Sequence, residues 1–470
     1  MRNLSRGVLA LLLAAGLGGL GGTAHAAAPG RSGDDDVLTR LKAIPGMTVE
    51  EKTSALSGYR WFWLNYRQPV DHRHPERGWF EQRVLLEHKS ADRPMVLYTS
   101  GYNTPETMFL SEPTALVSGN QISVEYRYFT PSRPEPAVWK KDTIWQAATD
   151  EHRLITALKT IYHGKWISTG ASKGGMTATY HKRFYPSDVD GTVAYVAPND
   201  VNNTDDSAYD RFFKTVGTDP KCRANLESLQ RELLKRRPEI LARMTADAQK
   251  AGYTWKIIKT VDRAFENSVM DFEWAFWQYH LQSECADIPA TTASTDVIYS
   301  YFDAISGALT YTDQSLEPYI PYYYQAGTQL GWPSPQFKHL RPLLRYESSY
   351  QPRTYVPSDI PMRFDPAAMK DVDHWVRTHA THMMFVYGQN DPWGAEPFRV
   401  GPGSRDSAVY VAPGQNHSGR LIAKLPDAQR ARATADLLRW AGVSPSQQAR
   451  TLSVPPQVAE DPSLAQRPPL

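Results

Sequence analysis

The 470-residue sequence predicts an α/β fold in which a mainly parallel sheet is interrupted by an inserted helical domain. As far as residue 199, short apolar and β-branched runs alternate with helix-like segments, which is typical of a parallel sheet covered on both faces. Residues 200–370 are helix-like and aromatic, with few strand signals. Strand-like runs then return, so we expect the last strands of the sheet to follow the insertion.

The individual elements follow from local sequence patterns. Apolar residues at helical spacing predict helices at 142–162 and 427–440. The run 271–279 is apolar around most of its circumference, which predicts a buried helix. Its rings would form either the core of the helical domain or a wall that faces a substrate. Runs rich in β-branched and aromatic residues predict strands at 59–66, 78–88, 95–99, 121–126, 166–169, 192–197, 383–388 and 408–412.

The N-terminus has the character of a targeting signal. Arg2 and Arg6 precede a short apolar stretch, and residues 24–26 (Ala-His-Ala) form a small-x-small cleavage site. No other stretch of the sequence is long and apolar enough to span a bilayer, so we expect a secreted protein. The predicted segments are a signal peptide (1–26), a flexible leader or propeptide (27–40), the first part of the core (41–199), a helical cap (200–370), the second part of the core (371–445) and a flexible tail (446–470).

The composition disfavours several classes of partner. Removal of the signal peptide takes away two arginines and no acids, which lowers the formal net charge from +2 to zero. A neutral surface argues against nucleic acid or an anionic membrane as the partner. His72 and His74 lie near each other, but no third and fourth ligand follows at zinc-like spacing. We expect these two histidines at the surface, and we expect a monomer that needs no metal or other cofactor.

The chain has two cysteines, Cys222 and Cys285. In an exported protein, two such cysteines are expected to form a disulfide. The bond would close a loop of about 60 residues, which the chain-entropy model values at roughly 4 kcal/mol.

The sequence around Ser172 carries the strongest functional signal. The run Gly170-Ala171-Ser172-Lys173-Gly174 follows a strand-like segment and precedes a helix-compatible one, which is the context of a nucleophile elbow. The two glycines remove side chains that would collide where the strand and the helix meet. Ser172 would then lie at a helix N-terminus, where backbone N–H groups favour a developing negative charge.

A serine hydroxyl needs a base within hydrogen-bond reach and a carboxylate that orients the base. In α/β-hydrolases the chain order is serine, acid, histidine, and the acid and the histidine follow late strands. Asp391 follows the strand predicted at 383–388, and His417 lies in a glycine-flanked loop after 408–412. Taken by itself, Asp391 could equally be a residue of an Asx-turn. Taken by itself, His417 could be an ordinary residue of a surface loop. Their order and positions together predict a triad with Ser172 in an α/β-hydrolase core.

The oxyanion hole of such an enzyme needs two preorganised N–H donors. The amide of Lys173, directly after the nucleophile, is predicted to be one of them. The second donor is expected in the loop after the strand at 95–99, at Tyr102 or Gly101. The side chain of Lys173 is expected to point to solvent or to a carboxylate.

Several stretches, spread over most of the mature chain, match a known family. They are 66–72 (Tyr-Arg-Gln-Pro-Val-Asp-His), 125–129 (Glu-Tyr-Arg-Tyr-Phe), 170–175 (Gly-Ala-Ser-Lys-Gly-Gly), 272–279 (Phe-Glu-Trp-Ala-Phe-Trp-Gln-Tyr), 388–393 (Gly-Gln-Asn-Asp-Pro-Trp) and 416–417 (Asn-His). On these stretches the chain resembles the secreted bacterial prolyl tri-/tetrapeptidyl aminopeptidases. More distantly, it is similar to the lysosomal prolyl carboxypeptidase and dipeptidyl peptidase group.

The resemblance implies a serine exopeptidase with an α/β-hydrolase core and a helical cap. It implies Ser172, Asp391 and His417 as the triad, and release of short N-terminal peptides with proline favoured at the cleaved residue. In the distant group a histidine stands where this chain has Tyr126, so no detailed role is carried over to Tyr126.

An exopeptidase of this kind must hold a free N-terminal ammonium at a set distance from its nucleophile, and a partly desolvated carboxylate is the natural partner. Glu125, beside Arg127 at a strand end, is the first candidate, although these two residues could equally form a structural ion pair. Asp205 and Asp206, at the start of the cap, are the second candidates.

The prediction is a secreted serine aminopeptidase that acts on peptides with a free N-terminus. Trp393 and aromatic residues of the cap are expected to form a shallow pocket for proline. Two other functions are considered: an esterase or lipase with the same core, and a non-catalytic secreted binding protein on a hydrolase fold. The matching stretches outside the elbow disfavour the first, and the intact serine-aspartate-histidine order disfavours the second.

Overall fold

The computed structural model describes residues 37–444, so the predicted signal peptide, most of the predicted leader and the predicted tail (446–470) lie outside the described residues. The centre of the described part is a nine-stranded sheet of order β1-β2-β3-β5-β4-β6-β7-β8-β9. The pairs from β1 to β5 on this list are antiparallel, and the pairs from β5 to β9 are parallel. The strands are β1 (Met47–Lys52), β2 (Arg60–Pro69), β3 (Trp79–His88), β4 (Met95–Thr99), β5 (Asn120–Val124), β6 (Trp166–Ala171), β7 (Gly191–Tyr195), β8 (Met383–Gly388) and β9 (Ala408–Ala412).

Every strand expected from the sequence has a counterpart in the sheet, and β1 is an addition. β1 pairs with β2 at the edge of the sheet and is largely polar, so its sequence alone carries little strand signal. The prediction of a flexible leader is wrong for residues 37–40, because they belong to helix α1 (Val37–Lys42). Val37 and Leu41 are buried in the cluster that also holds Leu97 of the sheet, and this burial fixes the helix.

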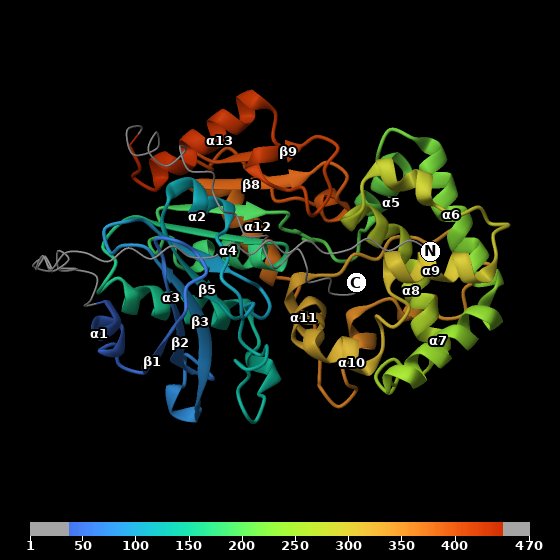
Figure 1. Ribbon diagram of the computed structural model, residues 1–470, viewed down its shortest axis with the longest axis horizontal. Helices are drawn as coiled ribbons and strands as arrows, with labels where there is room; N and C mark the ends of the chain where they lie inside the picture. The colour runs from blue at the N-terminus through green and yellow to red at the C-terminus, as the bar shows by residue number, and fades with distance from the viewer. Residues whose placement is uncertain (1–36, 445–470) are drawn as a thin grey trace, which may run out of the picture.

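Helices cover both faces of the sheet (Figure 1). Alternate residues of each buried strand point to opposite faces, so Leu97 of β4 packs in one cluster and Val96 in another. The first face is covered by α1, α3 (Ile144–Leu158), α4 (Lys173–Phe184) and α12 (Ala368–His379), and the second by α2 (Glu112–Val117) and α13 (Asp427–Trp440). Because these strands are buried on both sides, their sequences are continuous apolar runs.

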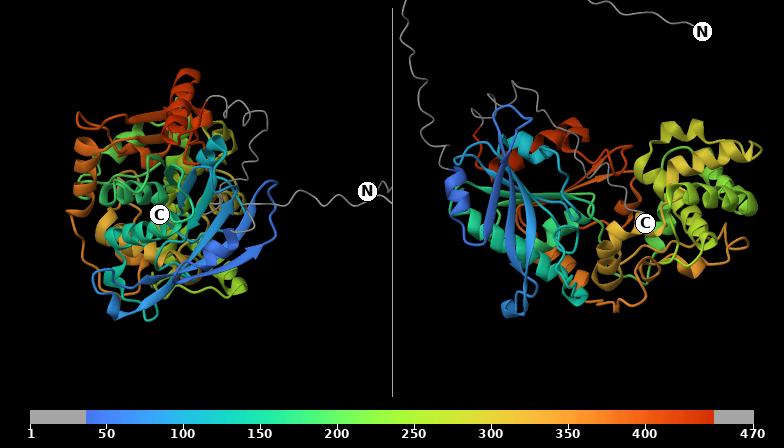
Figure 2. Two further views of the ribbon diagram at one scale, coloured as in Figure 1. Left: turned by 90° about the vertical axis from the view of Figure 1, so that its left-hand side faces the viewer. Right: turned by 60° about the horizontal axis from the view of Figure 1, so that its bottom comes forward.

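Apart from α12, the helices between β7 and β8 form a body of their own at one end of the sheet (Figures 1 and 2). The long helix α8 (Val261–Tyr279) lies within it, and Phe272, Trp274 and Phe276 are almost fully buried, as predicted for 271–279. The predicted disulfide between Cys222 and Cys285 is present in this body. The remaining helices of the insertion are α5 (Ser207–Thr215), α6 (Pro220–Lys235), α7 (Arg237–Ala251), α9 (Thr295–Ser306), α10 (Asp313–Leu316) and α11 (Ile320–Gln325).

Candidate active site

Ser172 lies at the sharp turn between β6 and α4. Its backbone has φ 56° and ψ −127°, a conformation that costs energy for a residue with a side chain and that marks a nucleophile elbow. The Ser172 N–H donates to the Tyr195 carbonyl at 2.9 Å, which ties the turn to β7. A Cβ on Gly174 would collide with the Thr99 carbonyl, and a Cβ on Gly170 would collide with the Thr99 hydroxyl. The two glycines are therefore needed for the close packing predicted from the sequence.

Asp391 and His417 are hydrogen bonded to each other. The Asp391 side chain is fully buried, and its Oδ2 lies 2.8 Å from Nδ1 of His417. The other oxygen, Oδ1, accepts the Trp393 N–H at 3.1 Å, which fixes the carboxylate. Because Nδ1 faces the carboxylate, Nε2 is the ring atom left to act as a base. The loops that carry Ser172, Asp391 and His417 follow the parallel strands β6, β8 and β9, so they lie along one edge of the sheet.

The end of α8 holds the loop that carries His417. The His417 N–H donates to the Gln278 carbonyl at 3.1 Å, and Asn416 Nδ2 donates to the His280 carbonyl at the same distance. The rings of Tyr279 and His417 meet edge to face with centroids 6.3 Å apart. The helical insertion therefore supports the imidazole directly.

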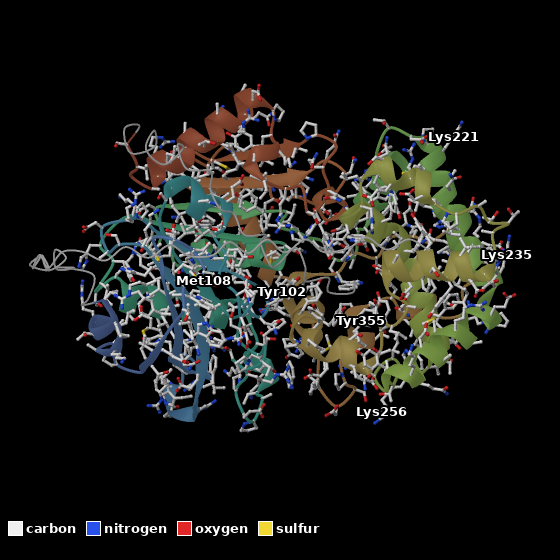
Figure 3. All side chains as sticks on the ribbon, viewed as in Figure 1. Tyr102, Met108, Lys221, Lys235, Lys256 and Tyr355 are labelled. Atoms are coloured by element: carbon white, nitrogen blue, oxygen red, sulfur yellow. A yellow bond between two sulfur atoms is a disulfide. The ribbon has the colours of Figure 1, made fainter. Side chains whose placement is uncertain are left out.

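Tyr102 lies at the junction of the core and the insertion (Figure 3), where its ring packs edge to face against Tyr319 and Tyr322. Its backbone N–H donates to Ser100 Oγ at 3.2 Å, so the amide already has a protein acceptor. Burial raises the pKa of Tyr102, and the interaction of its hydroxyl with the Ser172 side chain acts in the opposite direction. The amide of Tyr102 is thus already occupied, whereas its phenol is the group that interacts with the Ser172 side chain. The role of Tyr102 in the oxyanion hole stays a prediction.

The side chain of Lys173 is buried, which corrects the expectation that it could point to solvent. Its Nζ lies 3.1 Å from the centroid of the Tyr126 ring, a cation–π arrangement. Burial lowers the pKa of Lys173 to about 7, and the buried carboxyls of Asp142 and Glu151 oppose this shift. The amide of Lys173 is the first N–H of α4, next to the nucleophile.

A pocket opens beside Ser172, and most of its surface is apolar. Trp393 lines it, as the sequence predicts, and the Trp393 ring packs at a steep angle against Trp274 of α8 with centroids 5.0 Å apart. Asp200 is the acidic residue among the lining residues, and sequence reasoning missed it. The lining residues are Ser172, Lys173, Met176, Pro198, Asp200, Tyr322, Leu330, Gly331, Pro333 and Trp393.

Glu125 and Arg127 do not form an ion pair with each other. Glu125 is fully buried, and its Oε2 accepts from Arg83 Nη2 at 2.5 Å. Its Oε1 accepts from the Ser132 hydroxyl at 2.8 Å, and the Thr104 N–H donates to Oε2 at 3.1 Å. Both carboxylate oxygens therefore already have protein donors, and these contacts do not fit the predicted capture of a substrate ammonium.

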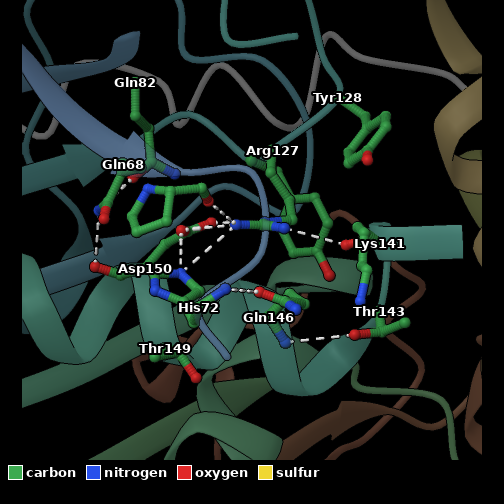
Figure 4. Close-up of polar contacts among 12 residues, drawn as sticks. Gln68, His72, Gln82, Arg127, Tyr128, Lys141, Thr143, Gln146, Thr149 and Asp150 are labelled. Carbon is green, nitrogen blue, oxygen red and sulfur yellow. Dashed lines mark hydrogen bonds and ion pairs between the residues drawn. The ribbon is translucent and has the colours of Figure 1, made fainter. Parts of the chain in front are cut away.

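Arg127 instead pairs with Asp150, and His72 joins this buried cluster (Figure 4). Arg127 Nε lies 2.6 Å and Nη2 lies 2.8 Å from the two Asp150 oxygens. His72 Nε2 lies 2.6 Å from Asp150 Oδ1, and only 3% of the His72 side chain is exposed. The prediction of a surface position is therefore wrong for His72, whereas 48% of the His74 side chain is exposed.

Asp205 and Asp206 each accept a backbone N–H close to the start of the insertion. Asp205 is fully exposed, and its Oδ1 accepts from the Ser207 N–H at 3.2 Å. Asp206 Oδ1 accepts from the Ser334 N–H at 3.0 Å. Neither residue lines the pocket beside Ser172.

Within residues 37–444, no group of three or more histidine, cysteine, aspartate or glutamate side chains is arranged to hold a metal ion. Over the same residues, no helix has the length and apolar character that crossing a bilayer requires.

Comparison with known proteins identifies the family. Residues 31–468 match the family model described as PS-10 peptidase S37. The chain belongs to the peptidase S37 family. A relative from Streptomyces mobaraensis, named prolyl tri/tetrapeptidyl aminopeptidase, is 56% identical over 448 residues, which cover 95% of this chain and 93% of that protein. This member of the peptidase S37 family is thus a serine peptidase, and its substrates are peptides.

More distant relatives were also found. The serine protease vicPb of Bipolaris victoriae is 24% identical over 213 residues, which cover 40% of this chain and 39% of that protein. Among solved structures, a proline iminopeptidase of Mycobacterium smegmatis matches 80% of this chain and 98% of its own length at 13% identity. Its TM-score to this chain is 0.35.

Proposed function

We propose that the protein is a secreted exopeptidase that removes tri- or tetrapeptides from the free N-terminus of peptides, with proline favoured at the cleaved residue. The observation that carries the proposal is the buried hydrogen bond between Asp391 Oδ2 and His417 Nδ1, 2.8 Å long, at the edge of the sheet where the elbow presents Ser172. The 56% identity to the Streptomyces aminopeptidase supports the substrate class.

In the proposed mechanism, Ser172 Oγ attacks the carbonyl carbon of the scissile bond. His417 Nε2 takes the hydroxyl proton and then gives it to the leaving amine, while Asp391 stabilises the imidazolium and keeps its orientation. The Lys173 N–H and the Tyr102 hydroxyl donate to the oxyanion of the tetrahedral intermediate. A water molecule, activated by the same imidazole, then releases the peptide from the acyl-enzyme.

The pocket beside Ser172 supports a preference for proline. Met176, Tyr322 and Trp393 line it and are buried. A pyrrolidine ring is apolar and has no N–H to satisfy, so such a surface can bind it without a dedicated polar partner.

A panel of chromogenic peptides tests the proposal. The panel varies the residue before the bond, the number of residues and the blocking of the N-terminus. We expect cleavage of unblocked tri- and tetrapeptides that end in proline, no turnover by Ser172→Ala, and loss of fluorophosphonate labelling in that variant. Cleavage of fatty esters without cleavage of any peptide would refute the proposed substrate class, and activity retained by Ser172→Ala would refute the nucleophile.

A further inference from the structure

Asp200 is a buried acid without a hydrogen-bonding partner. It lies in the segment that follows β7, and only 5% of its surface is exposed. Neither carboxylate oxygen accepts a hydrogen bond from residues 37–444. A buried carboxylate without donors is costly, so its retention calls for a partner that arrives from outside the chain.

The Asp200 carboxylate belongs to the pocket that contains the nucleophile. Asp200, Ser172 and Trp393 line the same pocket. Gly331 lies against the carboxyl group: a Cβ at this position would come within 2.8 Å of Asp200 Oδ2, and the φ of +89° also favours glycine. The backbone at Gly331 therefore fits closely around Asp200 and limits where the carboxylate can move.

The charges that act on Asp200 are negative. Burial, Glu396 and Asp206 together raise the pKa of Asp200 to about 7; the nearby Trp332 N–H, which donates to Asn203 Oδ1, opposes this shift. Glu396 is itself half-buried, and burial together with Asp206 and Asp205 raises its pKa to about 7, against Arg399 and Arg211. Lys173 also lines the pocket, but its ammonium lies over the Tyr126 ring. A ligand cation would therefore relieve both the missing donors and the mutual repulsion of the acids.

We infer that Asp200 binds the free N-terminal ammonium of the peptide substrate, with Glu396 and Asp206 adding negative charge around it, an inference that rests on the proposed function. An ammonium has three N–H donors and a full positive charge, which match the two unpartnered oxygens of Asp200. Because each residue of an extended peptide adds about 3.5 Å, a fixed anchor and a fixed nucleophile select the number of residues removed. Asp200 is thus a specificity-determining residue, because the distance between the ammonium site and Ser172 would set the number of residues removed.

The test compares Asp200→Asn with the wild type on two substrates, Ala-Ala-Pro-p-nitroanilide and its N-acetylated form. These peptides have no charged side chain, so the terminal amine is the single cation that differs between them. We expect kcat/KM for the free peptide to fall about ten- to hundredfold in Asp200→Asn, the range for a charge-assisted hydrogen bond. The acetylated peptide should change less than about twofold. The preference for three residues over two should also weaken in the variant.

Asp210→Asn is the matched control. It removes the same charge from the same acidic region, and its Oδ1 can still accept the Gln336 N–H, which Asp210 accepts at 2.7 Å. We expect Asp210→Asn to retain the wild-type ratio of free to acetylated rates. Fluorophosphonate labelling and the melting temperature confirm that the variants are folded. Should Asp200→Asn not fold, Glu396→Gln takes its place, with a severalfold loss expected on the free peptide alone.

Each other outcome overturns a defined part of the argument. An equal loss on both peptides would mean that Asp200 only shapes the pocket, and the ammonium site would be refuted while the peptidase assignment stands. Equal cleavage of both peptides by the wild type would also refute the ammonium site and leave the peptidase assignment unchanged. Absence of cleavage of either peptide by a wild-type protein that is labelled by fluorophosphonate would refute the proposed function, and the ammonium site with it.

Discussion

Substitution of Asp150 by asparagine is expected to destabilise the protein by about 3 kcal/mol. Arg127 is fully buried, and its Nε and Nη2 lie 2.6 and 2.8 Å from the two Asp150 oxygens. Removing one partner of a buried ion pair costs about 3–5 kcal/mol, because the other charge stays buried and unpaired. The guanidinium also donates to the carbonyls of Lys141 at 2.9 Å and Pro69 at 3.2 Å. These bonds survive the substitution, which places the expected cost at the lower end.

Urea denaturation followed by tryptophan fluorescence measures this cost. The series comprises the wild type, Asp150→Asn, Arg127→Met and the double variant that combines these two substitutions. We expect the double variant to be less destabilised than the two single variants added together, because it leaves no unpaired charge. A loss below about 1 kcal/mol in Asp150→Asn, or simple additivity in the double variant, would refute the reasoning.

The contribution of the Asp150–Arg127 pair to the free energy of unfolding is expected to fall at low pH. Burial raises the pKa of Asp150, but Arg127 and His72 outweigh it and hold the pKa below its ordinary value of 3.8. The stabilisation by this carboxylate is therefore complete above its unfolded pKa and is lost as the pH falls towards the folded pKa. The stability difference between the wild type and Asp150→Asn should shrink when the pH is lowered from about 6 to about 3.

Three further results are expected. Asp391→Asn should lower kcat about 10⁴-fold with little change in melting temperature, and a loss below about tenfold would contradict a triad role. Replacing Cys222 and Cys285 with serine should destabilise the insertion by about 4 kcal/mol, and an unchanged denaturation midpoint would count against that value. Gly174→Ala should lower soluble yield and melting temperature, since its Cβ would collide with the backbone of Thr99, and wild-type stability would show that the elbow packs more loosely.

Local sequence patterns were sufficient for much of the core and for the elements that carry the site. The strand, the glycine-flanked turn and the helix around Ser172 are neighbours in sequence, so their steric requirements are visible in the order of residues. Asp391 and His417 could be found because each follows a strand whose apolar pattern is clear.

Contacts between segments that are distant in the chain could not be predicted from local sequence patterns. Glu125 meets Arg83, 42 residues earlier, and His72 meets Asp150, 78 residues later. Nothing near either residue specifies that partner. Asp200 was missed for the same reason, because its importance comes from burial and from the absence of protein donors around it. One sequence signal was available: Asp200 follows the strand next to the elbow, a position where polar residues meet ligands in α/β folds.

The attachment of the His417 loop to the end of α8 limits how this enzyme can open. Any swing of the helical body that moved Gln278 and His280 would pull on the backbone of His417 and on Asn416. Motions that admit long peptides must therefore leave the contacts between the end of α8 and the His417 loop intact. A variant that lacks the helical insertion is therefore expected to lose the contacts that orient the His417 loop, even if its sheet still folds.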